Sequence, residues 1–254
     1  MLEAIIWGLV QGLTEFLPVS SSGHLRLVPD LFGMEAPDLA TSAVLHLGTL
    51  VAVVAFFRAD IGWIARGLDR APAARRVFIS LAVATVPAAI AGATLTRAVE
   101  RFQESATAVG AALLVTGSVL LASYFIPHRT GRIEEVGPRD AFGIGLFQAL
   151  ALLPGISRSG MVITAGMMRG LSATEAARFG FLMAVPVTLG AGVREAMALS
   201  VTAISAPQLV AGTAVAALSG YWAISLLTSI LARKGLWPFA LYCGVAGTIA
   251  LLRL

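Results

Sequence analysis

Six long apolar segments with almost no charged residues dominate the pattern of hydrophobic and polar positions in this chain. A helix of about 20 apolar residues is long enough to cross a hydrocarbon layer about 30 Å thick. Each segment is close to that length, so the pattern predicts transmembrane helices in an all-α, polytopic membrane protein. The predicted spans are 39–57, 77–96, 105–126, 179–199, 207–231 and 236–252.

Two further stretches are broken where a spanning helix would continue. Pro18 interrupts the first and Pro154-Gly155 interrupts the second, and the residue before a proline is pushed out of helical geometry. Each stretch predicts a re-entrant hairpin of two short helices, whose turn is buried in protein or lines a wet cavity. The short helices are predicted at about 4–16 and 22–33, with Ser20-Ser21-Ser22 as the cap of the latter, and at about 139–152 and 158–168.

The two broken stretches are copies of one sequence element. Shifting the chain by 137 residues aligns them from Gln11 onward and matches glutamine, leucine, two serines and glycine. The copies have diverged in their chemistry, because Glu15 and Ser21 of the first align with Leu152 and Arg158 of the second. We expect the two stretches to form one site.

The order of the spans predicts how the copies are related in the membrane. Three predicted spans follow each hairpin, and an odd number inverts the second half relative to the first. Such inverted repeats bring broken helices from opposite sides together near the bilayer midplane. The halves are predicted at about 1–126 and 137–254 of a single membrane domain, 1–254. Hairpins that crossed the whole bilayer would also leave the halves inverted. The sequence therefore does not distinguish re-entrant hairpins from hairpins that span the bilayer.

Composition and charge agree with this prediction and orient it. Charged residues make up 13% of the 254 residues and hydrophobic residues 57%, whereas soluble domains are about a quarter charged. Twelve of the 18 basic residues fall in the loops at 58–76, 127–140, 169–178 and 232–235, and four fall in the loops of the other side. By the positive-inside rule the twelve face the cytoplasm and both termini face outward. Topology and anionic lipids account for the net charge of +4, and no nucleic-acid partner is expected.

Several single residues are interpreted as structural. The tryptophans lie mostly near the ends of predicted spans, as interface anchors do. Cys243, the only cysteine, is interpreted as a packing residue and His128 as a solvated loop residue. For His46, inside an apolar span, a neutral histidine bonded to a neighbouring helix is favoured over a catalytic one. The tryptophans are Trp7, Trp63, Trp222 and Trp237.

The first hairpin carries a carboxylate, hydroxyls and an imidazole. Gln11 and Glu15 are four residues apart and share a helix face. An ionised Glu15 among apolar neighbours must be paired or line water. His24 lies three residues after Ser21 and four after Ser20, on one face of the second short helix. A hydroxyl within reach of an imidazole is typical of an activated nucleophile or a proton-transfer pair.

The second hairpin carries a guanidinium at a predicted helix start. Arg158 stays charged, and its planar fork suits a phosphate or a carboxylate. The free N–H groups of a first helical turn also favour an anion. Together with the serine run of the first hairpin, two helix starts could cradle one polyanion. Further donors and close backbone approach come from Gly155, Ser157, Ser159 and Gly160.

Alternatives stay open for three of these residues. Glu15 and Arg158 would also form a purely structural ion pair that pins the hairpins together, although this leaves the hydroxyls and His24 without a purpose. Thr164, on the last short helix, either adds a hydroxyl to the cavity or bonds back to its own helix.

At these residues the sequence resembles a known family. The run from Gln11 to His24 reads Gln-x-x-x-Glu followed by Phe-Leu-Pro-Val-Ser-Ser-Ser-Gly-His. With Pro-Gly-Ile-Ser-Arg-Ser-Gly and Thr164, it is similar to the bacitracin-resistance type of undecaprenyl-pyrophosphate phosphatase, over the whole chain in length and span order. The resemblance implies hydrolysis of a polyprenyl diphosphate lipid, the cell-wall carrier, to its monophosphate. It also implies a bacterial plasma membrane location with a site open to the outer face.

The resemblance assigns roles to residues. The acidic pair of the family corresponds to Gln11 and Glu15, its hydroxyl and histidine to Ser21 and His24, and its phosphate-binding arginine to Arg158. Activity that depends on a divalent cation, Mg²⁺ or Ca²⁺, is implied, with Glu15 as the expected ligand. Many members have a second glutamate where this chain has Gln11, and the family pattern admits either. Whether a second copy of the chain is a partner is left open.

The resulting hypothesis is a phosphatase whose serine-rich turns and arginine bind the diphosphate. The nucleophile is Ser21 or a water, with His24 as base and later as acid, and a phosphohistidine at His24 also stays open. Glu15 holds a divalent cation, orients His24, or does both. One alternative is a lipid-carrier flippase or an anion transporter, because broken helices in inverted repeats are a transporter architecture. Another is an intramembrane serine protease, which Arg158 opposite the hydroxyls disfavours.

Overall fold

The computed structural model describes residues 1–198 and 205–253, and every regular element in these ranges is helical. This confirms the all-α prediction for the described residues; residue 199, the end of the predicted span 179–199, lies outside them. The elements are α1 (Leu2–Phe16), α2 (Ser21–Phe32), α3 (Leu39–Phe56), α4 (Arg58–Gly67), α5 (Pro72–Thr94), α6 (Thr96–Glu104), α7 (Ala106–Ala122), η1 (Ser123–Phe125), η2 (Ile133–Glu135), α8 (Pro138–Leu150), α9 (Arg158–Met168), α10 (Ala173–Ala198), α11 (Ala206–Lys234) and α12 (Trp237–Arg253).

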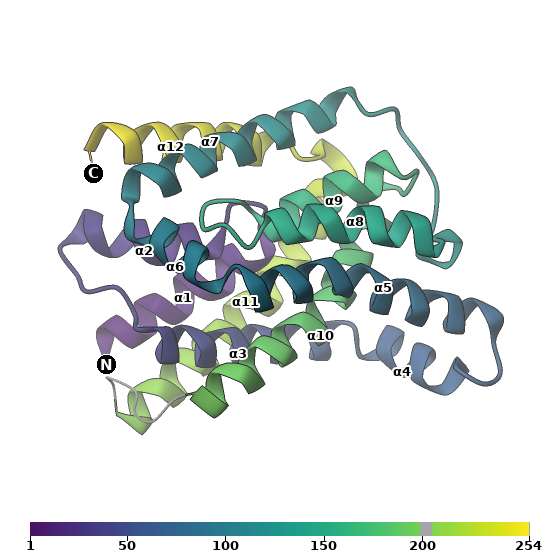
Figure 1. Cartoon of the computed structure of the whole chain (residues 1–254), viewed down its shortest axis with the longest axis horizontal. Coiled ribbons are helices and arrows are strands. Elements are labelled where there is room, and N and C mark those ends of the chain that lie inside the picture. The colour runs from purple at the N-terminus through teal and green to yellow at the C-terminus, as the bar shows by residue number, and fades with distance from the viewer. Residues whose placement is uncertain (199–204, 254) are drawn as a thin grey trace.

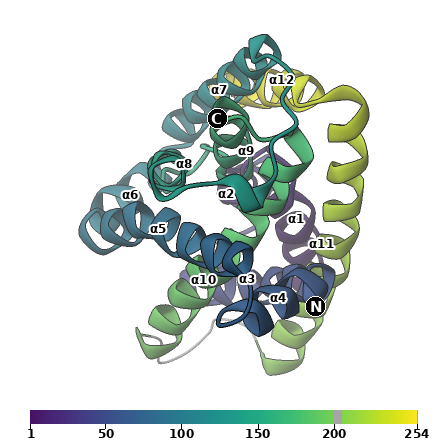
Figure 2. The same ribbon diagram turned by 90° about the vertical axis from the view of Figure 1, so that its right-hand side faces the viewer.

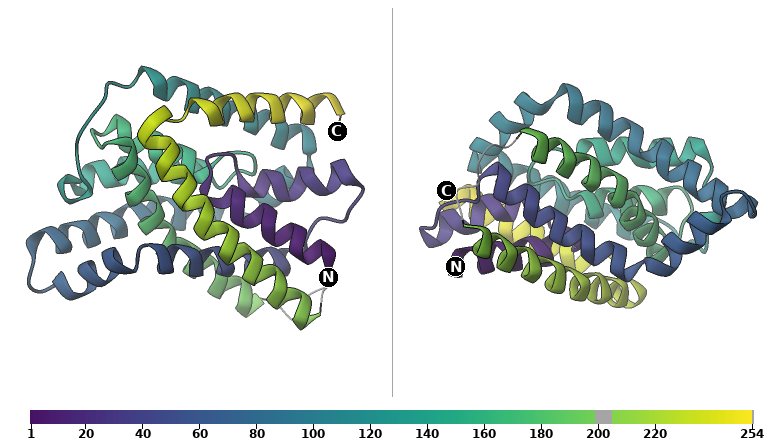
Figure 3. Two further views of the ribbon diagram at one scale, coloured as in Figure 1. Left: turned by 180° about the vertical axis from the view of Figure 1, so that it is seen from behind. Right: turned by 90° about the horizontal axis from the view of Figure 1, so that it is seen from below.

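Two pairs of short helices point into the molecule from opposite ends (Figure 1). α1 and α2 enter from the end at which both termini lie, α8 and α9 enter from the other end, and their turns meet in the middle (Figures 1 and 3). α1 packs along α11, and α8 packs along α5. The first helix of each pair therefore packs against a long helix from the other half of the sequence.

The remaining long helices enclose these pairs. α7 lies along α12 on one side of the molecule, and α3 contacts α10 and α11 on the opposite side (Figure 2). Between them the aromatic rings of Phe16 on α1 and Phe181 on α10 pack edge to face, with centroids 5.5 Å apart. Phe16 is 1% exposed, so this contact fixes the end of α1 inside the core.

Serine caps close the two inward turns at equivalent places of the repeat. α1 ends because Leu17, the residue before a proline, is extended with φ −64° and ψ 140°. Ser20 then caps α2, and its Oγ accepts a hydrogen bond from the Gly23 N–H at 3.3 Å. Ser157 caps α9 in the same way and accepts from the Gly160 N–H at 3.2 Å. The serine run is thus the helix cap that the sequence predicts.

Several helices present large apolar side chains to the outside, as helices in lipid do. Leu218 is 75% exposed and Leu241 is 63% exposed. Among the described residues, α5, α11 and the stretch Ala106–Phe125 are long and apolar enough to cross a membrane. α3 and α4, bent by 72° at their junction, form a fourth candidate, and α12 is apolar but shorter. The chain is therefore a multi-pass membrane protein by these criteria, with three or four of the six predicted spans supported.

Two predictions from the sequence are corrected by the structure. The loop predicted at 58–76 is largely helical, because α4 fills its first part and α5 begins at Pro72. Trp7 is not an interface anchor: it is 5% exposed and packs against Leu25 and Leu45. The reason is that Trp7 lies on the face of α1 that packs against its neighbouring helices, whereas residues such as Leu2 and Leu9 on α1 are exposed.

The interpretations of Trp222, Trp237, His128 and Cys243 agree with the structure, whereas Trp63 is only partly exposed and packs against the core. Trp222 is 58% exposed and Trp237 is 45% exposed, as anchors at a membrane surface would be. His128 is exposed in the loop after α7. Cys243 is fully buried, and its Sγ donates to the Pro18 carbonyl oxygen at 3.6 Å, so it packs α12 against the turn of the first pair.

Candidate active site

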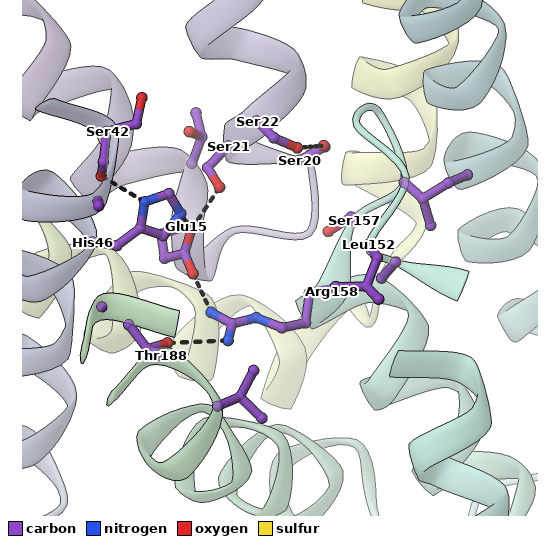
Figure 4. A pocket seen from close by; sticks show the side chains of 16 residues that line it. Glu15, Ser20, Ser21, Ser22, Ser42, His46, Leu152, Ser157, Arg158 and Thr188 are labelled. Carbon is purple, nitrogen blue, oxygen red and sulfur yellow. Dashed lines mark hydrogen bonds and ion pairs between the residues drawn. The ribbon is translucent and has the colours of Figure 1, made fainter. Parts of the chain in front are cut away.

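A cavity of about 270 Å³ lies where the two helix pairs meet (Figure 4). The structure thus brings the two broken stretches together around one space. Six predicted site residues line it: Glu15, Ser20, Ser21, Ser22, Ser157 and Arg158. The sequence analysis did not place the others there: Thr14, Ser42, Ala43, His46, Ala151, Leu152, Ile156, Val187, Thr188 and Gly192.

The two turns are locked together by direct hydrogen bonds. The Gly155 N–H donates to Ser20 Oγ at 3.1 Å across the repeat. Thr116 Oγ1 on α7 donates to the Gly155 carbonyl at 2.8 Å and accepts from the Ser157 N–H at 3.0 Å. Gly155 has φ +93°, and a Cβ there would lie 2.4 Å from the Val109 carbonyl oxygen. Gly155 therefore shapes the turn, and Thr116, hidden in an apolar segment, has no sequence signal of its role.

Glu15 is the centre of the polar groups in the cavity. Its Oε1 pairs with Nη2 of Arg158, which reaches across from the second helix pair. Its Oε2 accepts from Ser21 Oγ at 2.5 Å and from Gln11 Nε2 at 3.1 Å. The carboxylate is 7% exposed, and three donors satisfy it. The ion pair considered as a structural alternative is formed, and it lies in the wall of the cavity beside a hydroxyl.

Arg158 occupies the first position of α9 and points into the cavity (Figure 4). Its Nη1 donates to Thr188 Oγ1 on α10 at 3.3 Å, and its side chain is 22% exposed. The cap residue Ser157 holds the start of the helix beside it. A guanidinium at a helix start thus points into the cavity, and both the guanidinium and the helix start favour an anion.

His24 does not form the predicted pair with Ser21. Its Nδ1 lies 2.8 Å from the Ser20 carbonyl oxygen, and its Nε2 lies 2.7 Å from the Tyr242 hydroxyl. The imidazole also stacks on the Tyr242 ring and is buried outside the cavity lining. In α2 the imidazole folds back onto the carbonyl that precedes its own helix, which turns it toward α12 and away from the Ser21 hydroxyl.

The histidine in the cavity is His46 on α3. Its Nδ1 lies 2.8 Å from the Ser42 carbonyl oxygen, one turn earlier, and its Nε2 lies 3.6 Å from Glu15 Oε2. The side chain is 35% exposed, in the wall of the cavity. The predicted contact with a neighbouring helix is thus made with Glu15 of α1, while the hydrogen bond of Nδ1 stays within α3 and the place of the ring in the cavity was not predicted. An isolated histidine in an apolar segment carries no motif that would have revealed this.

The remaining predicted residues lie behind the cavity wall. Ser159 Oγ donates to the Leu17 carbonyl at 3.2 Å and ties α9 to the first turn. A Cβ on Gly160 would meet Leu120 at 2.9 Å, so this glycine allows close packing. Thr164 is buried, and its hydroxyl has no hydrogen-bond partner among the described residues. The structure brings none of these three into the cavity lining.

A protein-bound divalent cation does not fit the residues around Glu15. Ca²⁺ takes about six to eight oxygen ligands, and Mg²⁺ about six in a regular octahedron. In the part of the chain that the structure describes, no three His, Cys, Asp or Glu side chains cluster around a possible metal position. The two oxygens of Glu15 face a guanidinium, an amide N–H and a hydroxyl. The expected cation ligand is thus already satisfied by protein donors.

Comparison with known proteins gives one consistent match over nearly the whole chain. Residues 4–249 match the family described as bacitracin resistance protein BacA. A protein of Myxococcus xanthus named undecaprenyl-diphosphatase is 40% identical over 264 residues, covering 100% of this chain and 89% of the relative. Proteins of the same name from Geobacter sulfurreducens and Rubrobacter xylanophilus are 41% and 43% identical, covering 97% and 95% of this chain and 96% and 94% of theirs.

Proposed function

The chain belongs to the BacA family, and we propose that it is a membrane phosphatase that hydrolyses undecaprenyl diphosphate to the monophosphate and inorganic phosphate. This activity returns the lipid carrier to cell-wall synthesis and accounts for bacitracin resistance. The observation that carries the proposal is the hydrogen bond from Ser21 to Glu15 in a cavity that also holds Arg158. A hydroxyl on a carboxylate beside a fixed guanidinium is an arrangement suited to phosphoryl transfer.

The substrate diphosphate is held by Arg158 and by the starts of α2 and α9. These starts carry the caps Ser20 and Ser157, and both line the cavity. Backbone N–H groups at a helix start stabilise a phosphate through direct donation and through the helix dipole. The donors are already fixed by the locked turns, so they need no reorganisation as charge develops on the transferred phosphoryl group.

Phosphoryl transfer to the enzyme begins at Ser21. Its Oγ attacks the terminal phosphorus while its proton passes to Glu15, which already accepts that hydrogen bond at 2.5 Å. The bond from Oγ to phosphorus forms as the bond from phosphorus to the bridging oxygen breaks. The lipid monophosphate leaves with that electron pair, and Arg158 neutralises charge on the non-bridging oxygens. Glu15 thereby takes the role of base that the sequence analysis gave to His24.

Water completes the cycle at the phosphoserine. Glu15 first gives its proton to the departing lipid phosphate and then accepts one from the attacking water. The water oxygen bonds to phosphorus as the bond to Ser21 Oγ breaks, and Glu15 returns the proton to that oxygen. The products are inorganic phosphate and the free enzyme, so each turnover consumes one water.

The test is phosphate release by detergent-purified protein on a polyprenyl diphosphate. Ser21→Ala removes the attacking oxygen and is expected to lower turnover by at least about 10³-fold. Ser22→Ala is the matched control in the same cavity, because the hydrogen bond of its hydroxyl among the described residues is to Ser20 Oγ, at 3.3 Å, and not to Glu15, and turnover should stay within about tenfold. Acid quench of the wild-type protein with labelled substrate should trap label on Ser21. Near-normal release by Ser21→Ala would leave direct attack by water as the mechanism.

The membrane arrangement is part of the proposal. We infer that the halves form an inverted repeat in a bacterial plasma membrane, with both termini and the cavity mouth on the outer side. Two observations support the inverted repeat. The two helix pairs enter from opposite ends, and the first helix of each pair packs against a long helix of the other half, α1 against α11 and α8 against α5. The position of both termini at one end agrees with it.

A transporter is the second candidate, and the same arrangement favours it. Broken helices that meet from opposite ends are typical of secondary transporters. The phosphate-release assay in detergent separates the two, because detergent supports no gradient. Release that depends on Ser21 and Arg158 identifies the phosphatase. If folded protein released no phosphate, Arg158 would instead be assigned to the substrate-binding site of a transporter.

A further inference from the structure

Gln11 lies beside the reacting groups, and the proposed chemistry leaves it without a role. It is fully buried on α1, one turn before Glu15. Its Nε2 donates to Glu15 Oε2 at 3.1 Å. Its own Oε1 has no hydrogen-bond partner among the described residues. The amide is therefore oriented by the carboxylate alone, since the opposite orientation would place two acceptor oxygens against each other.

Both oxygens of Glu15 already accept hydrogen bonds from protein donors. Arg158 takes Oε1, and Gln11 and Ser21 take Oε2. His46 Nε2 lies 3.6 Å from Oε2 on a third side. A cation at Glu15 would compete with these donors and would stand beside a permanent positive charge on Arg158. Such a position is repulsive for a divalent ion in a buried site.

A glutamate in place of Gln11 would instead favour a cation beside Glu15. Two carboxylates would then face each other across the 3.1 Å that the amide now bridges. Like charges this close cannot both stay ionised in a buried site unless a proton or a cation lies between them. A cation bridging two carboxylates is also a reasonable start for an all-oxygen site. The neutral amide of Gln11 therefore removes the charge repulsion that a cation would otherwise relieve at this position.

We propose that the side-chain amide of Gln11 takes the place of a cation at Glu15, so that this chain holds no divalent ion of its own at the site before substrate binds. Any Mg²⁺ or Ca²⁺ that assists turnover arrives on the diphosphate, whose oxygens supply its ligands. The statement that the cation arrives on the diphosphate rests on the proposed phosphatase function. The statement that the substrate-free protein holds no divalent ion does not, and it is tested without substrate.

The experiment measures cation binding and thermal unfolding of the full chain in detergent. Wild type, Gln11→Glu and Gln148→Glu are purified with Ca²⁺ and then exchanged into chelator or into Ca²⁺ or Mn²⁺. Gln148→Glu is the matched control, because Gln148 is buried at the equivalent place of the repeat but is followed four residues later by Leu152. Binding is read with radioactive Ca²⁺ and with the Mn²⁺ spin-resonance signal.

We expect no stoichiometric binding by the wild type and a midpoint of unfolding that chelator leaves unchanged. Gln11→Glu should bind one ion, and saturating cation should raise its midpoint by roughly 5 °C or more. Gln148→Glu should show neither effect. One equivalent of Ca²⁺ bound to the wild type, and lost in Glu15→Gln, would overturn the inference, and so would a Gln11→Glu variant that is folded and indifferent to cations.

Phosphate release measured on the same preparations keeps the two proposals separate. Absence of release from folded wild type would count against the phosphatase and leave the cation results standing. Cation binding by substrate-free wild type would count against Gln11 as the replacement and leave the phosphatase standing.

Discussion

The carboxylate of Glu15 joins the two copies of the repeat at the scale of single residues. It holds the Arg158 guanidinium of the second copy on one oxygen and the Ser21 hydroxyl of the first copy on the other. Removal of either partner would leave a buried charge partly unpaired, which is costly inside a protein. Glu15, Arg158 and Ser21 thus orient one another, so the substitution of any one of them should displace the other two.

Arg158→Lys tests whether the planar fork of the guanidinium is needed. Arg158 reaches Glu15 through Nη2 and Thr188 through Nη1, and a lysine ammonium is a compact charge without the planar fork that spans these two partners. We expect turnover to fall by at least about 100-fold while the protein stays folded. The control is Arg169→Lys, an arginine with a side chain 47% exposed and paired to Asp140, which should change turnover less than about twofold. Equal losses of turnover in Arg158→Lys and Arg169→Lys would contradict the assignment of Arg158 as the phosphate-binding residue.

His24 and Tyr242 test a structural role against a chemical one. Tyr242→Phe removes the hydroxyl 2.7 Å from His24 Nε2 and leaves that buried nitrogen without its partner. We expect about 1–3 kcal/mol lower stability in detergent unfolding, with turnover kept within about tenfold. His24→Ala should lose stability further, because the contact with the Ser20 carbonyl disappears as well. Abolished turnover at unchanged stability in Tyr242→Phe would instead place this pair in the chemistry.

At the scale of elements, the turn between α8 and α9 is the part of the site that substitution disturbs most. Gly155 has φ +93° and no room for a Cβ, which would lie 2.4 Å from a backbone oxygen of Val109. We expect Gly155→Ala to lower stability by about 3 kcal/mol or more and to abolish turnover, since Ser20 and Ser157 are held by the same turn. The measurement is unfolding in detergent beside phosphate release.

Gly170 provides the control for backbone strain alone. It has φ +96°, and a Cβ there would meet nothing within 4 Å. Gly170→Ala should therefore cost only the strain of that conformation, about 1–2 kcal/mol, and keep turnover. Similar losses in both variants would show that backbone strain, and not the packing of the two turns, sets the stability of the site.

The sequence predicts helix starts and ends well where neighbouring residues determine them. The end of α1 before Pro18, a serine cap on α2 and the start of α9 at Arg158 all follow from residues within one helical turn. The repeat also predicts that the two stretches share a site, because a buried Glu15 needs a partner and the second copy supplies one. These inferences need no knowledge of distant packing.

Long-range contacts are the part that the sequence does not reveal. His24 and Tyr242 are 218 residues apart, and Thr116 lies 39 residues from the Gly155 carbonyl that it bonds. Three-residue spacing alone suggested that His24 serves Ser21, but the packing of α12 offers the imidazole a better partner. His46 enters the cavity only because α3 lies against the first helix pair, which no periodicity of α3 indicates.

At the scale of the whole molecule, the membrane orientation decides which side supplies the substrate. The termini lie at one end, and the connection between α4 and α5 lies at the other (Figure 1). That connection is flanked by the basic residues of 58–76, and in the proposed orientation, which follows the positive-inside rule, it faces the cytoplasm and the termini face outward. The outward-facing first helix pair would then open the cavity toward the outer leaflet.

Single cysteines test this orientation directly. Glu3→Cys should react with an impermeant maleimide in intact spheroplasts, and Asp69→Cys, between α4 and α5, should react only after permeabilisation. Both positions are exposed, so access and not burial sets the rate. The wild-type chain serves as the blank, because its single cysteine, Cys243, is fully buried. The reverse pattern would place the basic loops outside, and the cavity would then have to receive its lipid diphosphate from the cytoplasmic leaflet.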